Sequence, residues 1–439
     1  MFDKPVLIAK VVVYTFAFLG REIRRAFSRT AEGLSARITS GTAHVVRDLN
    51  IVVVGANFAG LQAARAISMN LPPNSRYRVV VVEPNSHFQF TWVLPRFCVA
   101  KSHEHKAFVP YGGNLKPVPE GAIQWKRDRV VGLSKSHVTL QDSGEEVPYE
   151  YLVIATGSAV EEGLPSRTNS TDKLESMRRL REMQNSIEKA NRIVVVGGGA
   201  AGVEVATDAK SMYPNKTVIL VHSRKALMHR FGAGLQKAAI EGFDKLGGET
   251  ILEERVVSED KEAGTVTLRS GRVIECDLFI NCTGQKPASD ILKDLAPDAI
   301  TESGHIKVKP TLQLDNDDFP NIYACGDVAD TKTPNPNGRS ASRQADVAAD
   351  NVLLAVRGKP PTYLFETNWA DGMIKLTLGM DRSVTHIGDG QKELLWESAE
   401  KNEELMAAHC WWNLGVKAYE DDSVPLDMVS TEGVKKGDV

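Results

Sequence analysis

The sequence feature that most constrains this chain is a strand, a glycine turn and a helix that occur twice along it. The first copy begins in the β-branched segment 50–54 and the second in the segment 192–196, and a segment with helical character follows each turn. A continuous β-branched run is typical of a buried parallel strand. A turn of this kind presents backbone amides and the positive end of a helix dipole to a pyrophosphate. The two copies therefore predict an α/β protein that binds two dinucleotides.

The first turn spans 55–60, and the strand expected at 77–82 ends at Glu83. Gly55 permits the tight turn, Gly60 lets the helix pack close to the strand, and Glu83 can accept hydrogen bonds from a ribose hydroxyl. Asn57 replaces the middle glycine, so an ordinary β–α turn of a doubly wound sheet remains the alternative. The expected nucleotide-binding residues here are Gly55, Ala56, Asn57, Phe58, Ala59, Gly60 and Glu83.

The second turn has all three glycines, Gly197, Gly199 and Gly202, which makes the dinucleotide interpretation strong. The strand after it, 217–221, ends without an acid and is followed by Arg224. A carboxylate would repel a 2′-phosphate, whereas an arginine can pair with one. NADPH is therefore admissible beside NADH. The alternative is that Arg224 only covers a solvated loop.

Three further segments have the same form, an apolar strand that ends in a small, tight turn: 151–157, 277–284 and 321–327. A helix rich in small residues is expected at 340–355. Together with the two glycine turns, these segments resemble the pyridine nucleotide–disulfide oxidoreductase superfamily over about residues 48–355. The resemblance implies an α/β fold of two Rossmann-like (βαβ, three-layer) dinucleotide-binding domains, with the NAD(P) domain inserted in the FAD domain, plus a small C-terminal α+β domain.

The resemblance also implies the cofactors. FAD is expected at the first turn and NADH or NADPH, the electron donor, at the second, so that a hydride passes from nicotinamide to flavin when the rings stack. Asp327 matches the aspartate that binds the flavin ribityl chain; a helix N-cap is the alternative. Four turn residues complete this cofactor-binding set: Thr156, Gly157, Gly284 and Gly326.

Within the superfamily, the chain looks most like the apoptosis-inducing-factor-like branch. The segment 88–96 occupies the position where that family brings a loop and an arginine to the FAD, so Arg96 carries over, and Val130 matches a valine whose backbone faces the adenine. Glu204 is expected near the nicotinamide amide as the catalytic residue, or as a helix-dipole partner. Gln344 is expected at the pyrimidine edge of the flavin, or exposed to solvent.

The five cysteines, at 98, 276, 282, 325 and 410, are too scattered for a disulfide framework. Cys276 and Cys282 lie on one expected strand, which holds them apart. Because no redox dithiol is predicted, the flavin is expected to reduce its acceptor directly. No metal site is predicted.

The predicted domains follow the motifs: an N-terminal targeting or membrane-anchor segment (1–47), an FAD-binding domain in two parts (48–165 and 296–359), an NAD(P)H-binding domain (166–295) and a C-terminal domain (360–439). In the last of these, 373–378 and 383–387 are expected to form a hairpin and 392–414 to be mostly helical. The chain after Tyr419 is expected to be a solvated tail.

The N-terminal segment is apolar from Val6 to Leu19 except for Lys10 and Thr15, and basic residues flank it. As a helix it reaches about 21 Å, short of the roughly 30 Å hydrocarbon core. A mitochondrial transit or anchoring helix, an interfacial membrane helix, and a helix packed on the protein's own surface are the three interpretations. We expect a protein associated with a mitochondrial or other intracellular membrane surface, with a soluble catalytic body.

The net charge of −3 gives no general attraction to nucleic acid, and no nucleic-acid partner is expected. A monomer or a homodimer is expected. The resemblance implies an FAD-dependent NAD(P)H oxidoreductase that reduces a quinone-type acceptor. The alternatives are a reductase of a small electron-transfer protein and a redox-sensing, pro-apoptotic signalling flavoprotein.

Overall fold

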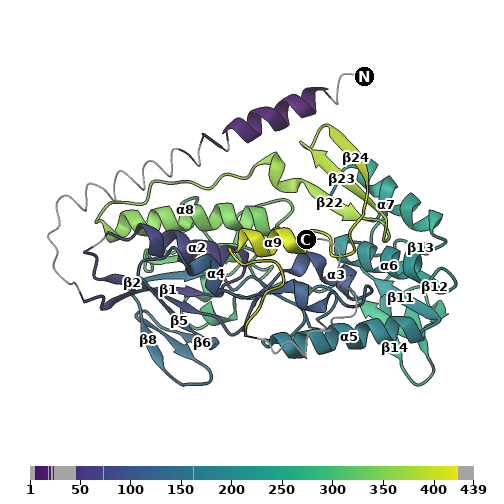
Figure 1. Ribbon diagram of the computed structural model, residues 1–439, viewed down its shortest axis with the longest axis horizontal. Coiled ribbons are helices and arrows are strands. Elements are labelled where there is room, and N and C mark those ends of the chain that lie inside the picture. The colour runs from purple at the N-terminus through teal and green to yellow at the C-terminus, as the bar shows by residue number, and fades with distance from the viewer. Residues whose placement is uncertain are drawn as a thin grey trace.

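The computed structural model of the protein describes residues 5–17, 19–20, 23, 46–72, 74–161 and 163–423. Two parallel sheets lie side by side along its long axis (Figure 1). The first sheet has the order β20-β9-β1-β2-β5, and all of its neighbouring strands are parallel. Its strands are β1 (Leu49–Val54), β2 (Tyr77–Val82), β5 (Ile123–Lys126), β9 (Tyr151–Ile154) and β20 (Ile322–Ala324).

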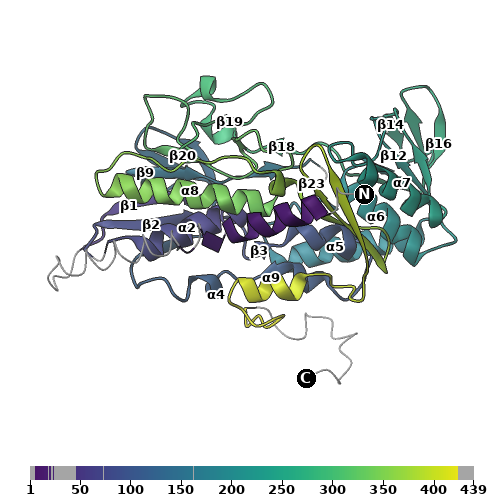
Figure 2. The ribbon, with the colours of Figure 1, turned by 90° about the horizontal axis from the view of Figure 1, so that it is seen from above.

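Both faces of the first sheet are buried, which is why its strands are continuously apolar. On β1, Ile51 and Val53 belong to one core cluster, while Val52 and Val54 belong to another. Helices α2 (Phe58–Asn70) and α8 (Gly338–Val356) pack together over the first of these faces (Figure 2). The antiparallel strands β6 (Val130–Leu133), β7 (His137–Leu140) and β8 (Glu146–Pro148) contribute to the core on the other face.

The second sheet has the order β13-β12-β11-β17 and is also parallel. It is formed between β9 and β20 of the first sheet in the sequence, so the predicted insertion of one Rossmann-like domain into the other is confirmed. Its elements are β11 (Arg192–Val196), α6 (Ala200–Met212), β12 (Thr217–Val221), α7 (Ala233–Lys245), β13 (Glu249–Ile251) and β17 (Leu278–Asn281), with the antiparallel strands β14 (Val256–Asp260), β15 (Thr265–Leu268) and β16 (Val273–Glu275) beside it.

Shorter elements connect these layers. The helical ones are η1 (Thr91–Val93), α3 (Leu94–Phe97), η2 (Glu104–Ala107), α4 (Gly112–Leu115), α5 (Lys173–Lys189), η3 (Asp290–Leu292), η4 (Pro297–Ala299) and η5 (Trp369–Gly372). The paired short strands are β3 (Phe88–Gln89) with β4 (Phe108–Val109), β10 (Ser158–Ala159) with β18 (Lys286–Pro287), and β19 (Ile306–Lys307) with β21 (Ala329–Asp330).

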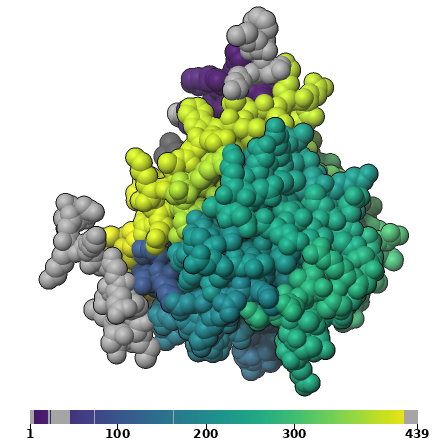
Figure 3. Space-filling model, turned by 90° about the vertical axis from the view of Figure 1, so that its right-hand side faces the viewer, coloured from purple at the N-terminus to yellow at the C-terminus, as the bar shows by residue number. Residues whose placement is uncertain are grey.

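The C-terminal region is a three-stranded antiparallel sheet and a helix. The predicted hairpin is confirmed as β22 (Ile374–Thr377) and β23 (Arg382–Gly388). The predicted helix at 392–414 is wrong over its first part, since β24 (Glu393–Ala399) pairs with the whole of β23 and only α9 (Ala407–Asn413) is an α-helix. Figure 3 shows this sheet lying against the second Rossmann-like unit.

The expectation of a solvated tail after Tyr419 is wrong for Asp421, whereas Glu420, Asp422 and Ser423 are exposed. The Asp421 carboxylate is only 5% exposed and pairs with His87 Nε2 at 2.8 Å and Lys173 Nζ at 2.5 Å. His87 directly precedes β3, and Lys173 is the first residue of α5. Asp421 therefore joins the C-terminal segment to both of these elements. Burial acts to raise the pKa of Asp421, but the hydrogen bonds from His87, Lys173 and Ser423 outweigh it and hold this pKa below its usual range.

Residues 5–17 of the N-terminal segment are helical. One side of this helix contacts the C-terminal region, where Leu7 is fully buried, Lys10 pairs with Asp389, and the Tyr14 and Trp369 rings lie 5.8 Å apart. Apolar side chains on the other side face solvent. Among the described residues, no helix has both the length and the apolar character needed to cross a membrane.

Candidate active site

One cavity of about 2350 Å³ runs between the two sheets. A typical small-ligand pocket measures about 300–1,000 Å³, so this cavity has room for more than one large ligand. Both glycine turns line it, and each turn follows the carboxyl end of a parallel strand. Ligands of open α/β sheets bind at these carboxyl ends.

The first turn is shaped by close packing. Gly55 has φ +89°, and a Cβ there would lie 2.6 Å from the carbonyl oxygen of Ala155. A Cβ on Gly60 would lie 1.8 Å from the carbonyl oxygen of Gly55. Asn57 has an ordinary negative φ and caps α2, because its side chain accepts from the amide of Phe58. The position therefore needs no glycine, and the departure from the usual pattern is explained by a capping role.

Glu83 directly follows β2 and lines the cavity beside this turn. Its carboxylate accepts three hydrogen bonds, from the backbone amides of Ala56 and Asn85 and from the side-chain amide of Asn85. A carboxylate has about four acceptor positions, so capacity remains for a ribose hydroxyl. Burial raises the pKa of Glu83, and these backbone hydrogen bonds oppose that rise. The residues present thus fit an adenosine dinucleotide.

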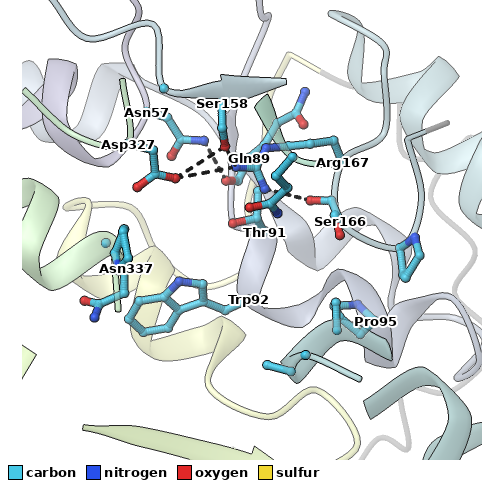
Figure 4. Close-up of a pocket in the computed structure, with 18 of the residues that line it drawn as sticks. Asn57, Gln89, Thr91, Trp92, Pro95, Ser158, Ser166, Arg167, Asp327 and Asn337 are labelled. Carbon is cyan, nitrogen blue, oxygen red and sulfur yellow. Dashed lines mark hydrogen bonds and ion pairs between the residues drawn. The ribbon is translucent and has the colours of Figure 1, made fainter. Parts of the chain in front are cut away.

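Asp327 follows β20 and faces the cavity (Figure 4). Ser158 Oγ donates to its carboxylate at 3.4 Å, and an Arg167 Nη lies 4.0 Å from it. The N-cap alternative is wrong, because α8 begins eleven residues later, at Gly338, and is capped by Asn337. Asp327 is therefore free to contact a ligand, as its resemblance to a ribityl-binding aspartate implies.

The second turn repeats the packing of the first. Gly197 has φ +113°, and a Cβ on Gly202 would lie 1.8 Å from the carbonyl oxygen of Gly197. The amide of Gly198 donates to His222 Nδ1 at 3.0 Å, which fixes the turn against the end of β12. Arg224 lines the same end of the cavity, together with Arg230 and Arg255.

Glu204 lies in α6, one turn before Asp208, and lines the cavity. Its Oε1 accepts from the backbone amide of Thr377 at 3.3 Å, so the carboxyl group is held against the C-terminal sheet. Burial and the nearby Asp208 carboxylate raise the pKa of Glu204 to about 8. Burial raises the pKa of Asp208 to about 6 against the opposing effect of Arg96. A carboxyl group that is mostly protonated at neutral pH therefore faces the cavity.

The structure places most of the predicted site residues around this one cavity: Gly55, Ala56, Asn57, Phe58, Ala59, Glu83, Val130, Thr156, Gly157, Gly197, Gly199, Glu204, Arg224, Gly284, Gly326 and Asp327. Gly60 and Gly202 lie behind the turns, where their lack of a side chain permits the close helix packing described above.

Two predicted cofactor contacts require correction. Arg96 does not line the cavity: its Nε donates to Asp208 Oδ2 at 2.7 Å and its Nη2 to the carbonyl of Gly379 at 2.9 Å. Gln344 is buried behind the turn after β20, where it accepts from the amide of Gly326 at 2.7 Å and donates to Thr331. Both side chains use their polar atoms on the protein itself. Gln344 supports Gly326, which lines the cavity, whereas Asp208 and Gly379, the partners of Arg96, do not line it.

Sequence reasoning missed several residues that line the cavity. Ser158 and Arg167 lie beside Asp327, and Trp92 lies opposite them in the close-up (Figure 4). Lys375 and Glu400 pair on the wall that the C-terminal sheet contributes. Ser158 directly follows the turn at 151–157 and Trp92 lies within the segment 88–96, so their positions alone could have identified both. Arg167, Lys375 and Glu400 belong to no motif.

Comparisons with known proteins agree with this geometry. Residues 49–352 match the family described as pyridine nucleotide-disulphide oxidoreductase. Fe-regulated protein 8 of Mycosarcoma maydis is 33% identical over 394 residues, which cover 83% of this chain and 95% of that protein. Human ferroptosis suppressor protein 1 is 29% identical over 339 residues, which cover 75% of this chain and 85% of that protein.

Among solved structures, the sulfide:quinone oxidoreductase of Aquifex aeolicus has a TM-score of 0.66 at 17% identity, covering 84% of this chain and 92% of that one, a likeness of fold alone. The fold, the two glycine turns and the family match together assign FAD and NAD(P)H as cofactors. The chain belongs to the pyridine nucleotide-disulphide oxidoreductase family and is an FAD-dependent NAD(P)H oxidoreductase.

Proposed function

We propose that the electron acceptor of this oxidoreductase is a quinone. The proposal rests on the wall of the cavity that lies beyond the second glycine turn. The C-terminal region forms this wall from apolar and polar side chains, including Ile374, Leu405 and Met406. Among the described residues, Cys282 is the one cysteine that lines the cavity, and none of the five cysteines forms a disulfide. These side chains suit an acceptor that enters the cavity and takes electrons directly from the flavin. A planar, apolar quinone is such an acceptor.

The chain's own contribution is to bind and orient the reactants. The first turn, Glu83 and Asp327 hold the FAD, and the second turn holds the nicotinamide dinucleotide. When bound, the FAD supplies a ring that accepts a hydride and passes electrons on. Glu204, held by the amide of Thr377, offers a hydrogen bond from a protonated carboxyl group to the nicotinamide carboxamide.

The proposal is tested with the purified full-length protein under anaerobic conditions. NADH or NADPH is expected to bleach the visible flavin bands, and a soluble ubiquinone analogue is expected to restore them within the turnover time. Flavin that is reduced by the nucleotide but is not reoxidised by the quinone would refute the quinone acceptor and favour a small electron-transfer protein.

The second turn also predicts a nucleotide preference. Arg224, which is exposed at the cavity, is expected to pair with a 2′-phosphate. Arg224→Glu should therefore raise the KM for NADPH at least about 10-fold and the KM for NADH less than about 3-fold, since a charge-assisted hydrogen bond contributes about 1.5–3 kcal/mol. Steady-state kinetics with both nucleotides measure this. Equal effects on the two KM values would rule out the 2′-phosphate contact, and Lys225→Glu is the neighbouring control.

We further propose that the N-terminal helix attaches the protein to a mitochondrial or other intracellular membrane surface. Its side away from the C-terminal region exposes Val13 to 67% and Phe16 to 71%. A Phe or Val side chain gains about 1.5–3 kcal/mol when it is fully buried in an apolar phase. This gain is enough to hold the helix at a lipid interface with help from the basic residues of the segment.

Replacing Val13 and Phe16 by serine should weaken binding to vesicles of phosphatidylcholine and cardiolipin by at least about 10-fold in a co-sedimentation assay. Serines at Thr15 and Ala17, which are also exposed on the helix, provide a matched control and should leave binding within about 2-fold. Equal binding by both double variants would contradict a lipid contact through this side of the helix.

A further inference from the structure

Trp92 stands out among the aromatic residues of the cavity. It lies in η1, lines the cavity, and keeps 39% of its surface exposed. Its neighbours Phe88 and Phe90 are almost fully buried. Figure 4 shows the indole ring of Trp92 inside the cavity, between Asn337 and Pro95. A large aromatic surface thus faces the cavity and is also open to solvent.

The indole is held in place from behind. It stacks on the ring of Phe58, with the centroids 5.6 Å apart and the planes 21° apart, and lies 5.6 Å from the ring of Phe90. Phe58 is itself wedged against the first residue of α8, because a Cβ on Gly338 would lie 2.6 Å from its ring. Val93 and Leu94, which follow Trp92, are fully buried. The ring is therefore a fixed platform and not a mobile surface side chain.

A fixed, exposed aromatic face in a cavity favours a planar conjugated ligand. Offset stacking contributes about 0.5–1.5 kcal/mol beyond the burial of area. The adenine end of the FAD is expected at Glu83 and Val130, and the nicotinamide dinucleotide at the second turn with Glu204. Trp92 lies in the segment 88–96 that the resemblance brings to the FAD, but it belongs to neither of these two sets, and its open edge is accessible to a molecule that arrives from solvent.

We infer that the indole face of Trp92 is the stacking surface for the ring of the electron acceptor and that it selects planar, conjugated acceptors. The inference rests on the proposed function, since it assigns the binding surface for the proposed quinone. Trp92 contacts the acceptor and takes no part in the hydride transfer between nicotinamide and flavin.

The kinetic test compares the holoenzyme with the variants Trp92→Ala and Trp92→Phe. Loss of the stacking should raise the KM for a soluble ubiquinone analogue about 3–10-fold in the alanine variant, and less in the phenylalanine variant. The KM for NAD(P)H, the bound FAD and the rate of anaerobic bleaching should be unchanged. Trp396→Ala is the matched control, because Trp396 is 66% exposed on β24 and does not line the cavity.

An equilibrium measurement separates this inference from the proposed function. Adding the oxidised ubiquinone analogue to the holoenzyme without NAD(P)H should quench tryptophan fluorescence in the wild type and in Trp396→Ala, and the quenching should be lost in Trp92→Phe. Quenching by a quinone that never reoxidises the flavin would support the stacking surface while refuting the proposed function. Quenching that persists in Trp92→Phe, or a Trp92→Ala protein that loses FAD or binds NAD(P)H more weakly, would overturn the inference.

Discussion

The variant Gly60→Ala is expected to purify without bound FAD, whereas Gly202→Ala is expected to keep its FAD but to lose reduction by NAD(P)H. In each case the added Cβ would lie 1.8 Å from the carbonyl oxygen of the glycine that begins the same turn. No side-chain rotation can relieve a clash between a Cβ and backbone. The helix must therefore move away from the strand, which displaces the amides that would contact the pyrophosphate.

The two variants serve as controls for each other, because the same atom is added at equivalent positions of two sites. Each is expected to weaken its own dinucleotide by at least about 100-fold, since displacing the turn removes several hydrogen bonds that each contribute about 1.5–3 kcal/mol to a charged group. The flavin absorbance of the purified protein reports the first site. Anaerobic titration with NADH and NADPH reports the second, and dithionite should still bleach the flavin of Gly202→Ala.

Gly112→Ala provides a neutral comparison, because a Cβ there has nothing within 4 Å and the residue lies away from the cavity. Its flavin content and its reduction by NAD(P)H should match the wild type. If Gly60→Ala retained full FAD, or if Gly202→Ala lost FAD while Gly60→Ala kept it, the assignment of the two turns to their cofactors would be wrong.

The turns could be assigned from the sequence because their chemistry is local. A β-branched strand, a glycine with positive φ and a second glycine under the helix all lie within a dozen residues, and the backbone geometry at Gly55 and Gly197 follows from that spacing. The resemblance to the family then implied the ribityl-binding role of Asp327 and the insertion of the NAD(P) domain in the FAD domain.

The failures concern side chains whose partners are distant in the sequence. Arg96 lies where the resemblance placed it, but the buried carboxylate of Asp208, 112 residues away, directs its guanidinium away from the cavity. Asp421 is held by His87, 334 residues earlier. The segment 393–399 contains good helix formers, but its pairing with β23 outweighs that local preference.

Glu204 is expected to give NAD(P)H binding a pH dependence centred near pH 8. Below that pH the carboxyl group is protonated and can donate a hydrogen bond; above it, the group is a carboxylate near a dinucleotide that carries negative charge. The KM of the wild type for NAD(P)H should therefore rise about 3–10-fold between pH 7 and pH 9, as expected for one hydrogen bond of about 0.5–1.5 kcal/mol. Glu204→Gln, which is neutral at every pH, should show no such rise. Glu204→Ala should have the higher KM already at pH 7.

Thermal unfolding provides an independent measurement of the same carboxyl group. The pKa of Glu204 is raised in the folded protein from an ordinary 4.5 to about 8. The folded state therefore binds the proton more tightly, and the stability it gains from this is fully present below pH 4.5 and is lost as the pH rises through 8. Glu204→Gln should melt close to the wild-type temperature at pH 4.5 and at a progressively higher temperature than the wild type as the pH rises to about 8, because the unfolded wild-type chain ionises this carboxyl group while the folded chain keeps it protonated. Since Asp208 and Arg96 are present in both proteins, the difference isolates Glu204. The contradicting outcome is a wild type that behaves like Glu204→Gln. If the melting temperature and the KM of the two proteins changed with pH in parallel, Glu204 would be ionised throughout this range.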